Sequence, residues 1–303
     1  MNKTDKMGYR PIRTSIDLSG PGVTVHRRSP PQDLAPYVEE FWQYKVSQSL
    51  DYLPMQVFPS GCVSMRFNIM PRRVDSVIYG PSTNNRMKAL FFQEWVVFGA
   101  TLRPDRAYHL LGLALAELRD LRINLDCFWP RLTADLEDQM YETETFKQRI
   151  TLLATFIRNM LRANAEPSTD FLNTFQDLLS SASRPDDISL TAKRHQISCR
   201  TMRRHFHQYL GLGPKQMERV LRAQGTMRQL IESPTSSLSA LSHDHGYSDQ
   251  SHLTREFRDI VGLSPKRFAS LVGKAHDKTL PEWTVLNPEW RHACDFKEMH
   301  RFR

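Results

Sequence analysis

The stretch that decides the fold is Met202-Arg203-Arg204-His205-Phe206, which is followed by Gly211-Leu212 and Pro214-Lys215. The pattern returns 51 residues later as Leu253-Thr254-Arg255-Glu256-Phe257, followed by Gly262-Leu263 and Pro265-Lys266. An apolar residue, an Arg, a Phe, a Gly-Leu pair and a Pro-Lys pair keep the same offsets in both copies. Self-similarity at a fixed offset is the signature of a repeated structural unit. The chain therefore contains a duplicated helical unit.

The first copy is predicted to form two helices joined by a sharp turn. Leu190-Thr191-Ala192 lies in a short amphipathic run, Gln196-Ile197 interrupts it, and Ser198 is a suitable N-cap for a helix through Tyr209. Gly211 then ends this helix as a left-handed cap, and Pro214 opens the next one, where its missing N–H costs little. The helical spacing of Met202, Phe206 and Tyr209 puts them on the buried face. The opposite face carries Arg200, Arg203, Arg204 and His207.

The second copy has the same predicted order. Leu238–Leu241 forms the supporting helix, Gly246-Tyr247 forms the turn, and either Ser248 or Asp249 is the N-cap of the second helix. Leu253 and Phe257 are expected to point inward. The outward face is left to Gln250, Ser251, His252 and Arg255.

A supporting helix, a tight turn and a second helix with a basic or amide-rich outer face are typical of a helix-turn-helix DNA reader. A single predicted helix, from Pro214 to about Ile231, joins the two units and ends before Ser233-Pro234. At 1.5 Å per residue it spans roughly 27 Å. Major-groove segments on one face of B-DNA recur about every 34 Å. One chain is therefore expected to read two half-sites without dimerising.

These residues resemble the AraC/XylS family of transcription regulators. The run from Gly246 to Phe257, with Gly262-Leu263-Ser264-Pro265, is similar to the family's second motif nearly letter for letter. Ile197–Phe206 and Gly211–Pro214 resemble its first motif. The resemblance covers about 100 residues, from near Phe171 to Val272. It departs at Ser242, where the family usually has Ala, and a Ser fits sterically.

The resemblance implies a sequence-specific DNA-binding regulator that is not an enzyme and needs no cofactor or metal. Its partners would be double-stranded DNA, a small-molecule effector and RNA polymerase, and it would act as a monomer or homodimer. The resemblance marks Arg200, Arg203, Gln250 and Ser251 as base-facing; because Arg204 and Arg255 are equivalent in the two copies, a shared phosphate or structural role is equally open. The full set of expected DNA-contacting residues is Ser198, Cys199, Arg200, Arg203, Arg204, Ser248, Gln250, Ser251, His252 and Arg255.

The N-terminal part, residues 21–165, reads as β-rich, because short apolar runs alternate with Pro, Gly and Asn. We expect a small barrel or sandwich, followed by helices over Pro104–Glu117 and Glu144–Leu161 and a linker at Ala165–Thr169. Phe58–Val63, Tyr79–Ser82 and Phe98–Pro104 loosely resemble an N-terminal domain of some AraC-type regulators, which implies small-molecule sensing or association. The expected strands are Glu40–Tyr44, Gln56–Phe58, Cys62–Asn68, Ser76–Tyr79, Ala89–Phe92 and Val96–Leu102.

The predicted fold class is α+β, a β-rich N-terminal domain followed by an all-α domain with two helix-turn-helix motifs joined by a linker helix. Residues 1–20 are expected to be a flexible N-terminus, residues 170–273 the DNA-binding domain and residues 274–303 a C-terminal extension. That extension contains Trp283, Trp290 and Phe296 among charged residues, and either docking or loose packing would suit it.

Charge and composition agree with a DNA-binding protein of the cytoplasm. The chain has 41 Lys and Arg against 33 Asp and Glu, and residues 184–273 alone have 14 against 8, a footprint expected of a phosphate-binding surface. No apolar run approaches the 18 or so residues of a membrane span, and no secretory signal is evident. Four scattered cysteines, Cys62, Cys127, Cys199 and Cys294, show no paired spacing that would indicate disulfides or zinc.

Three other interpretations of the sequence make different demands on its residues. A DNA-repair or alkyl-transfer protein using the same DNA-binding module would need an activated Cys, and neither Cys62 nor Cys199 has an evident activating base nearby. A protein-interaction scaffold would show no salt-dependent DNA affinity. Metal binding is disfavoured, because His26 and His109 are far apart and His205 and His207 point about 200° apart on a helix; the pair His243 and His245 is only slightly better placed.

Overall fold

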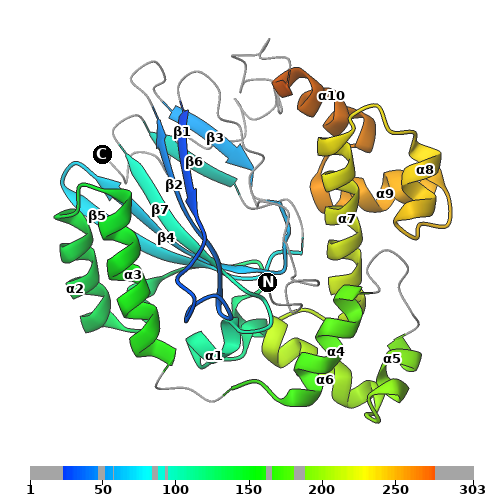
Figure 1. Cartoon of the computed structure of the whole chain (residues 1–303), viewed down its shortest axis with the longest axis horizontal. Coiled ribbons are helices and arrows are strands. Elements are labelled where there is room, and N and C mark those ends of the chain that lie inside the picture. Colours follow the sequence, from blue (N-terminus) through cyan, green and yellow to red (C-terminus); the bar gives the residue numbers. More distant parts are fainter. Residues whose placement is uncertain are drawn as a thin grey trace.

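An antiparallel six-stranded sheet forms the base of the N-terminal part, and a helical part follows it (Figure 1). The computed structural model describes residues 23–46, 52–56, 58–83, 88–92, 95–161, 166–180 and 188–276. The expected N-terminal segment 1–20 and most of the extension 274–303, with Trp283, Trp290, Phe296 and Cys294, lie outside the described residues. The α+β prediction is confirmed.

The large sheet has the strand order β1-β2-β7-β4-β5-β8, and every neighbouring pair is antiparallel. Two further strands, β3 and β6, pair with each other in a separate small sheet. The strands are β1 (Val23–Arg28), β2 (Val38–Val46), β3 (Tyr52–Gln56), β4 (Val63–Met70), β5 (Arg73–Tyr79), β6 (Lys88–Phe92), β7 (Val96–Leu102) and β8 (Arg122–Asn124).

Strand alternation separates an apolar face of the sheet from a more polar one. Phe41, Phe67 and Phe98 come from three neighbouring strands and are fully buried in one core with the helices that follow the sheet. The alternate positions Trp42 and Thr101 lie on the other face, where the indole Nε1 donates to the Thr101 hydroxyl at 3.1 Å. Aromatic side chains of the sheet therefore lie on both faces.

The helices after the sheet differ from the sequence prediction at one place. The expected helix over Pro104–Glu117 is wrong: α1 (Ala107–Leu111) ends at Gly112, and a short 3-10 turn, η1 (Leu115–Leu118), follows. Gly112 adopts φ 68°, a left-handed conformation that stops the helix. The helix expected over 144–161 is confirmed as α3 (Phe146–Leu161), while η2 (Leu125–Cys127) and α2 (Pro130–Tyr141) were not expected.

Three strands also differ from those predicted from the sequence. β1 and β8 were missed, because both hold charged residues and β8 is only three residues long. The strand expected over Gln56–Phe58 is wrong: it shares only Gln56 with β3, and Phe58 lies outside the strand, buried against the helical part. Tertiary contact, not strand pairing, decides the position of Phe58.

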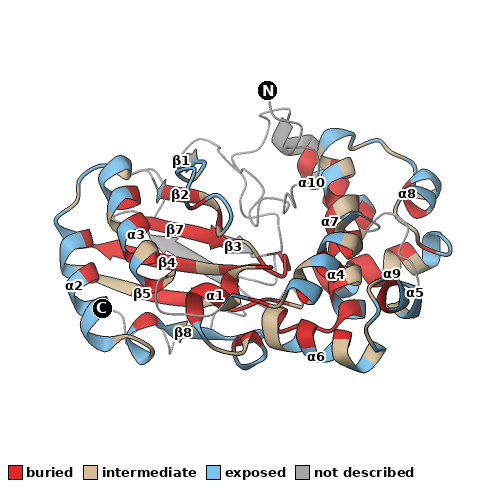
Figure 2. Cartoon of the chain, turned by 60° about the horizontal axis from the view of Figure 1, so that its bottom comes forward, coloured by how far each residue is buried: buried red, intermediate tan, exposed pale blue. Residues whose placement is uncertain are grey.

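The helical part consists of two small cores that share one long helix. The first core gathers Phe171, Phe175 and Phe206, and the second gathers Leu253, Phe257 and Phe268. Figure 2 shows buried residues running along α7, which contributes to both cores. The helices are α4 (Thr169–Ser180), α5 (Ile188–Arg194), α6 (Cys199–Leu210), α7 (Pro214–Glu232), α8 (Leu238–Asp244), α9 (Gln250–Val261) and α10 (Pro265–His276).

The sheet part packs directly on the end of α6. The rings of Tyr108 and Tyr209 meet edge to face with centroids 4.8 Å apart, and Gln208 donates to the Tyr108 hydroxyl at 3.4 Å. Gly211 approaches η1 so closely that a Cβ on it would lie 2.5 Å from the Leu115 carbonyl oxygen. No helix within the described ranges is long and apolar enough to cross a membrane.

Candidate nucleic-acid interface

The first recognition helix, α6, begins and ends where the sequence predicts. The Ser198 hydroxyl accepts a hydrogen bond from the Thr201 backbone N–H at 3.0 Å, and Gly211 ends the helix with φ 72°. Met202 and Phe206 are buried as expected. The rings of Phe206 and Phe171 meet edge to face, with centroids 5.6 Å apart. Capping and burial therefore fix which side of α6 faces solvent.

The solvent-facing side of α6 is basic. Arg200, Arg203 and Arg204 are exposed at helical spacings of three and four residues, and His207 continues the same face. Cys199 is half-buried at the first position of the helix, and the exposed Ser198 is occupied as its cap. The structure thus brings together the arginines that the sequence selected.

The second recognition helix, α9, is capped by Asp249 and not by Ser248. The Asp249 carboxylate accepts the His252 backbone N–H at 2.8 Å, and Ser248 donates its hydroxyl to the same carboxylate at 3.1 Å. The backbone bond, followed by the serine bond, holds the pKa of Asp249 below its usual value, so the cap stays charged. Gly262 ends the helix with φ 81°, as Gly211 does in the first copy.

The two turns differ by one residue. The supporting helices α5 and α8 begin at Ile188 and Leu238, 50 residues apart, whereas the recognition helices begin 51 residues apart. Each turn has one left-handed residue, Gln196 at φ 57° in the first and Gly246 at φ 69° in the second. The second turn therefore has one additional residue before its cap, so the repeat is not strictly regular.

The outer face of α9 is polar, and its residues differ in exposure and in the contacts that they already make. Gln250, Ser251 and Arg255 are exposed. His252 is only half-exposed: its Nδ1 lies 3.2 Å from the Ser248 nitrogen and hydroxyl, and its ring meets the Tyr247 ring edge to face. His252 therefore already holds the turn together, unlike its three exposed neighbours.

A buried ion-pair group, which sequence reasoning missed, attaches α9 to α7. Glu256 is 7% exposed and accepts hydrogen bonds from Arg222 Nε at 2.8 Å and Arg219 Nε at 3.0 Å. The Arg222 guanidinium lies over the Tyr247 ring, 5.1 Å from its centroid, and burial raises the pKa of Tyr247 to about 12. The available signal was the position of Glu256, beside Phe257 and three residues after Leu253, on the inward face.

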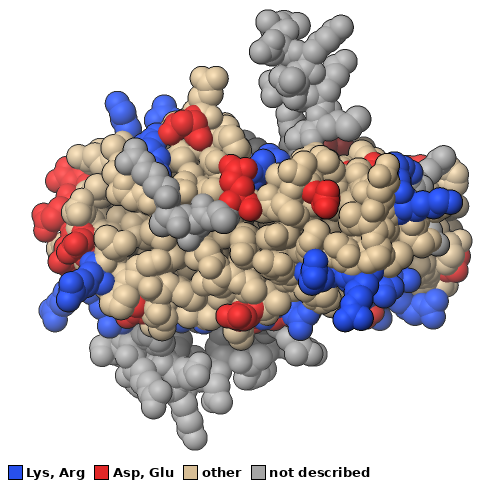
Figure 3. Space-filling view, turned by 90° about the horizontal axis from the view of Figure 1, so that it is seen from below, with Lys and Arg blue, Asp and Glu red and all other residues tan. Residues whose placement is uncertain are grey.

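Basic side chains gather on one edge of the helical part. On the face seen in Figure 3, Lys and Arg side chains cluster there, whereas the end that carries α2 shows Asp and Glu side chains mixed with Lys and Arg. The basic side chains lie on the same part of the chain as α6. This distribution favours contact between the helical part and a polyanion.

Comparison with known families decides the identity of this region. A family model described as a helix-turn-helix domain matches residues 191–270, which run from within α5 into α10. The match agrees with the resemblance of this region to the helix-turn-helix domain of AraC/XylS regulators, and the region is here named the AraC-type domain. A second model, described as a domain of unknown function, matches residues 26–124. No curated protein matches the chain significantly.

Solved structures similar to the chain include AraC-type regulators. A transcriptional regulator from Chromobacterium violaceum is 19% identical, with 35% of this chain and 93% of that chain covered and a TM-score of 0.33. A probable AraC family regulator from Rhodopseudomonas palustris is 21% identical, with 35% and 98% covered and a TM-score of 0.32. ToxT from Vibrio cholerae is 9% identical, with 82% and 97% covered and a TM-score of 0.40.

Two polar side chains of the AraC-type domain, Ser242 and His205, are buried. Ser242, which stands where the family usually has Ala, is buried, and its hydroxyl donates to the Ser239 carbonyl at 2.8 Å. His205 occupies in α6 the place that Glu256 occupies in α9, and its buried Nδ1 has no hydrogen-bond partner among the described residues. Burial, together with the nearby Arg204, lowers the pKa of His205, so the imidazole stays neutral.

The histidines and the cysteine considered for metal or thiol chemistry, His243, His245 and Cys62, do not form a reactive site. His243 is exposed, whereas His245 is half-buried with its Nε2 2.7 Å from the Gln229 amide oxygen. In the described ranges, no three or more His, Cys, Asp or Glu side chains form a group that could hold a metal ion. Cys62 is buried in the first core of the AraC-type domain, an apolar setting that disfavours the thiolate.

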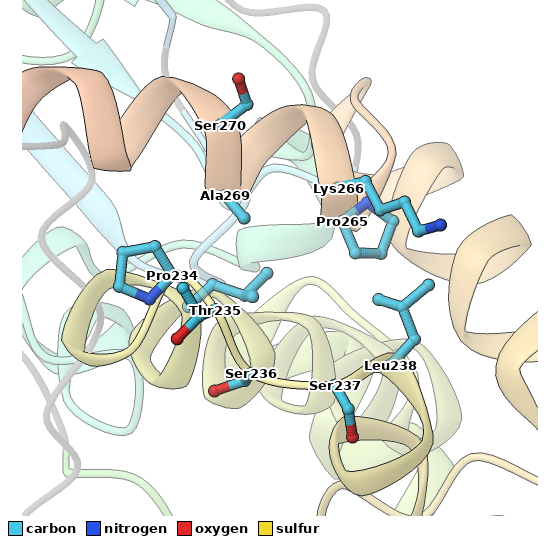
Figure 4. A pocket seen from close by; sticks show the side chains of 10 residues that line it. Pro234, Thr235, Ser236, Ser237, Leu238, Pro265, Lys266, Ala269 and Ser270 are labelled. Atoms are coloured by element: carbon cyan, nitrogen blue, oxygen red, sulfur yellow. The ribbon is translucent and has the colours of Figure 1, made fainter.

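The AraC-type domain also has an open groove away from the outer faces of α6 and α9. It has a volume of about 470 Å³ and lies between the end of α7, the segment that follows it and the start of α10 (Figure 4). Its walls include Leu230, Pro234, Leu238, Pro265 and Ala269, with Lys266 at one side. None of the residues expected to contact DNA lines this groove.

Proposed function

We propose that this AraC-type regulator binds an operator of two unlike half-sites, with α6 and α9 in successive major-groove segments. The observation that carries the proposal is the matched pair of helices, each capped at its start, ended by a left-handed Gly and exposing a polar outer face. The linking helix α7 has 19 residues and is therefore about 28 Å long. That length is close to the roughly 34 Å between major-groove segments on one face of B-DNA.

Different side chains give the two helices different preferences. Arg200 in α6 corresponds to Ser251 in α9, and Arg203 corresponds to Thr254. An Arg can bind guanine through two hydrogen bonds and a Gln, such as Gln250, can bind adenine in the same way, each worth about 1–3 kcal/mol of discrimination. The preferred operator is therefore asymmetric.

The other residues predicted to contact DNA are assigned to phosphate contact or to support of the turn, according to their positions on the helices. Arg204 and Arg255 take equivalent, exposed positions in the two helices, which suits contact with the phosphates that flank each half-site. Ser198, Cys199 and Ser248 lie at the helix starts, where helix N-termini commonly meet phosphate. His252 holds the second turn in place and supports Gln250 and Ser251 indirectly.

The N-terminal domain, residues 21–165, is proposed to bias DNA binding by the domain at residues 170–273. The support is its direct contact with the end of α6, through Tyr108 against Tyr209 and Leu115 against Gly211. A change in the sheet domain, caused by a small molecule or by association of two chains, would reach the first recognition helix through these contacts. RNA polymerase is the expected partner once the regulator is bound to its operator.

Selection of binding sites from a random duplex library tests the proposed function. The full chain should enrich two different half-sites with a fixed spacing of about one helical turn between their centres. Arg203→Ala should then relax preference within one half-site only. A chain that enriches a single short site, or no site at all, would contradict reading by two helices.

A further inference from the structure

A five-residue loop of the N-terminal part, Phe58–Cys62, lies deep in the DNA-binding part. The loop directly precedes β4, and all five of its residues are buried. Its two ends enter different cores: Phe58 belongs to the core around α9, and Cys62 belongs to the core around α6. One short segment therefore contacts both helix-turn-helix units.

At the first end of the loop, aromatic rings connect it to the second recognition helix. The Phe58 ring meets the Phe268 ring edge to face with centroids 5.9 Å apart. Phe268 in turn meets Phe257 of α9 edge to face at 5.7 Å. Edge-to-face rings prefer a defined geometry, so a displacement of Phe58 would displace this stack.

At the other end, the loop is pressed against the start of α7. Gly61 has φ 68°, and a Cβ on it would lie 2.7 Å from the Met217 sulfur. Met217 and Cys62 share the first core with Phe206 of α6. The left-handed conformation favours glycine, and the close approach brings the loop within reach of the first recognition helix.

Between its two ends, the loop is hydrogen-bonded to α7. The Gln224 side chain, 3% exposed, donates from Nε2 to the Pro59 carbonyl oxygen at 2.9 Å. Gln224 and Met217 are seven residues apart, which is about two turns on one face of the helix. The loop therefore follows α7 from one helix-turn-helix unit toward the other.

A single helix is a poor spacer by itself, because long helices bend. We propose that the Phe58–Cys62 loop is a positioning element that fixes the distance and angle between α6 and α9, and with them the half-site spacing that the protein accepts. The loop gives each unit a second attachment beside α7. This inference rests on the proposed reading of two half-sites by two helices.

The test compares operators that differ only in spacing. One base pair added between the half-sites moves the second by about 3.4 Å and rotates it by about 34°. The wild-type full chain should lose at least tenfold in affinity on the longer operator. Phe58→Ala and Gln224→Ala should lose threefold or less on the same change, while each isolated half-site is bound as by the wild type.

One control variant and the choice of two test variants separate positioning from simple loss of stability. Val272→Ala opens a cavity in the same core as Phe58 but on α10, and it should weaken binding to both spacings by the same factor. Gln224→Ala removes the hydrogen bond to the loop and leaves the Phe58 side chain in place. If Phe58→Ala fails to fold, Gln224→Ala alone tests whether the loop fixes the half-site spacing.

The outcomes remain distinct. If folded Gln224→Ala keeps the tenfold dependence on spacing, the loop does not position the helices. If the wild type binds paired half-sites at any spacing, the loop has no such role although the two-helix reading stands. If the wild type selects no paired half-sites, the proposed function fails, and the role of the loop fails with it.

Discussion

Replacing Glu256 by Gln should destabilise the second helix-turn-helix unit by about 3 kcal/mol. The Glu256 carboxylate faces both Arg222 and Arg219, with O···N distances of 2.8 and 3.0 Å. Removing one partner of a buried ion pair costs about 3–5 kcal/mol, because the other charge stays buried and uncompensated. We expect the lower end of that range, since the Gln oxygen can still accept one hydrogen bond from Arg222.

Arg222 and Arg219 should contribute unequally to the stability gained from pairing with Glu256. The Arg222 side chain is 10% exposed, so water screens its pairing with Glu256 very little. The Arg219 side chain is 38% exposed, and exposed pairs typically contribute about 0–1 kcal/mol. A double-mutant cycle should therefore give a larger coupling energy for Glu256 with Arg222 than for Glu256 with Arg219.

Urea unfolding of the full chain, followed by far-ultraviolet circular dichroism, measures these free energies. The cycles combine Glu256→Gln with Arg222→Met and, separately, with Arg219→Met. The reasoning is refuted if Glu256→Gln costs less than about 1 kcal/mol, the scale of an exposed pair. It is also refuted if the coupling to Arg219 equals or exceeds that to Arg222.

Three further predictions concern single residues. Arg203→Ala should lower discrimination at a few base pairs of one half-site by about 1–3 kcal/mol, whereas Arg204→Ala should weaken all duplexes and reduce the salt slope by about one if that residue binds phosphate; fluorescence anisotropy at several salt concentrations separates the two. Gly211→Ala should destabilise the chain, because φ 72° is strained for Ala and its Cβ would meet the Leu115 carbonyl oxygen; a lower thermal midpoint checks this, and an unchanged midpoint contradicts it. His205 has a lowered pKa, so its contribution to stability is complete above its ordinary value of 6.5 and is lost as pH falls toward the lowered value, because the unfolded chain then binds more protons. His205→Leu should make stability depend less on pH between about 7 and 5, and an unaltered pH profile would count against the assignment.

Local sequence signals were sufficient for the helical half of the molecule. Ser198 and the paired residues Gly211 and Gly262 mark helix ends through their own backbone and side-chain chemistry, so those ends were predictable. The exposed arginines of α6 followed from periodicity alone. The choice between Ser248 and Asp249 as cap did not, because both side chains suit the position and only the hydrogen bond to His252 decides it.

The sheet half was less predictable, because its contacts join residues far apart in the chain. β1 and β8 hold charged residues, and β8 has only three residues; each forms a strand by pairing with a neighbour, β1 with β2 and β8 with β5. The helix predicted over Pro104–Glu117 is interrupted at Gly112, whose left-handed conformation ends α1. Phe58 looked like the end of a strand, although its ring is buried in the DNA-binding half.

By itself, the sequence determined that this protein has two capped helix-turn-helix units with polar outer faces, because capping and helical periodicity depend on residues within one or two turns. Only the tertiary structure decided how those units are held. It placed Glu256 between two arginines of α7 and brought the Phe58–Cys62 loop against both cores. Those contacts join residues far apart in the chain, 34 positions for Arg222 with Glu256 and 165 positions for Gln224 with Pro59, and no local pattern encodes such pairings.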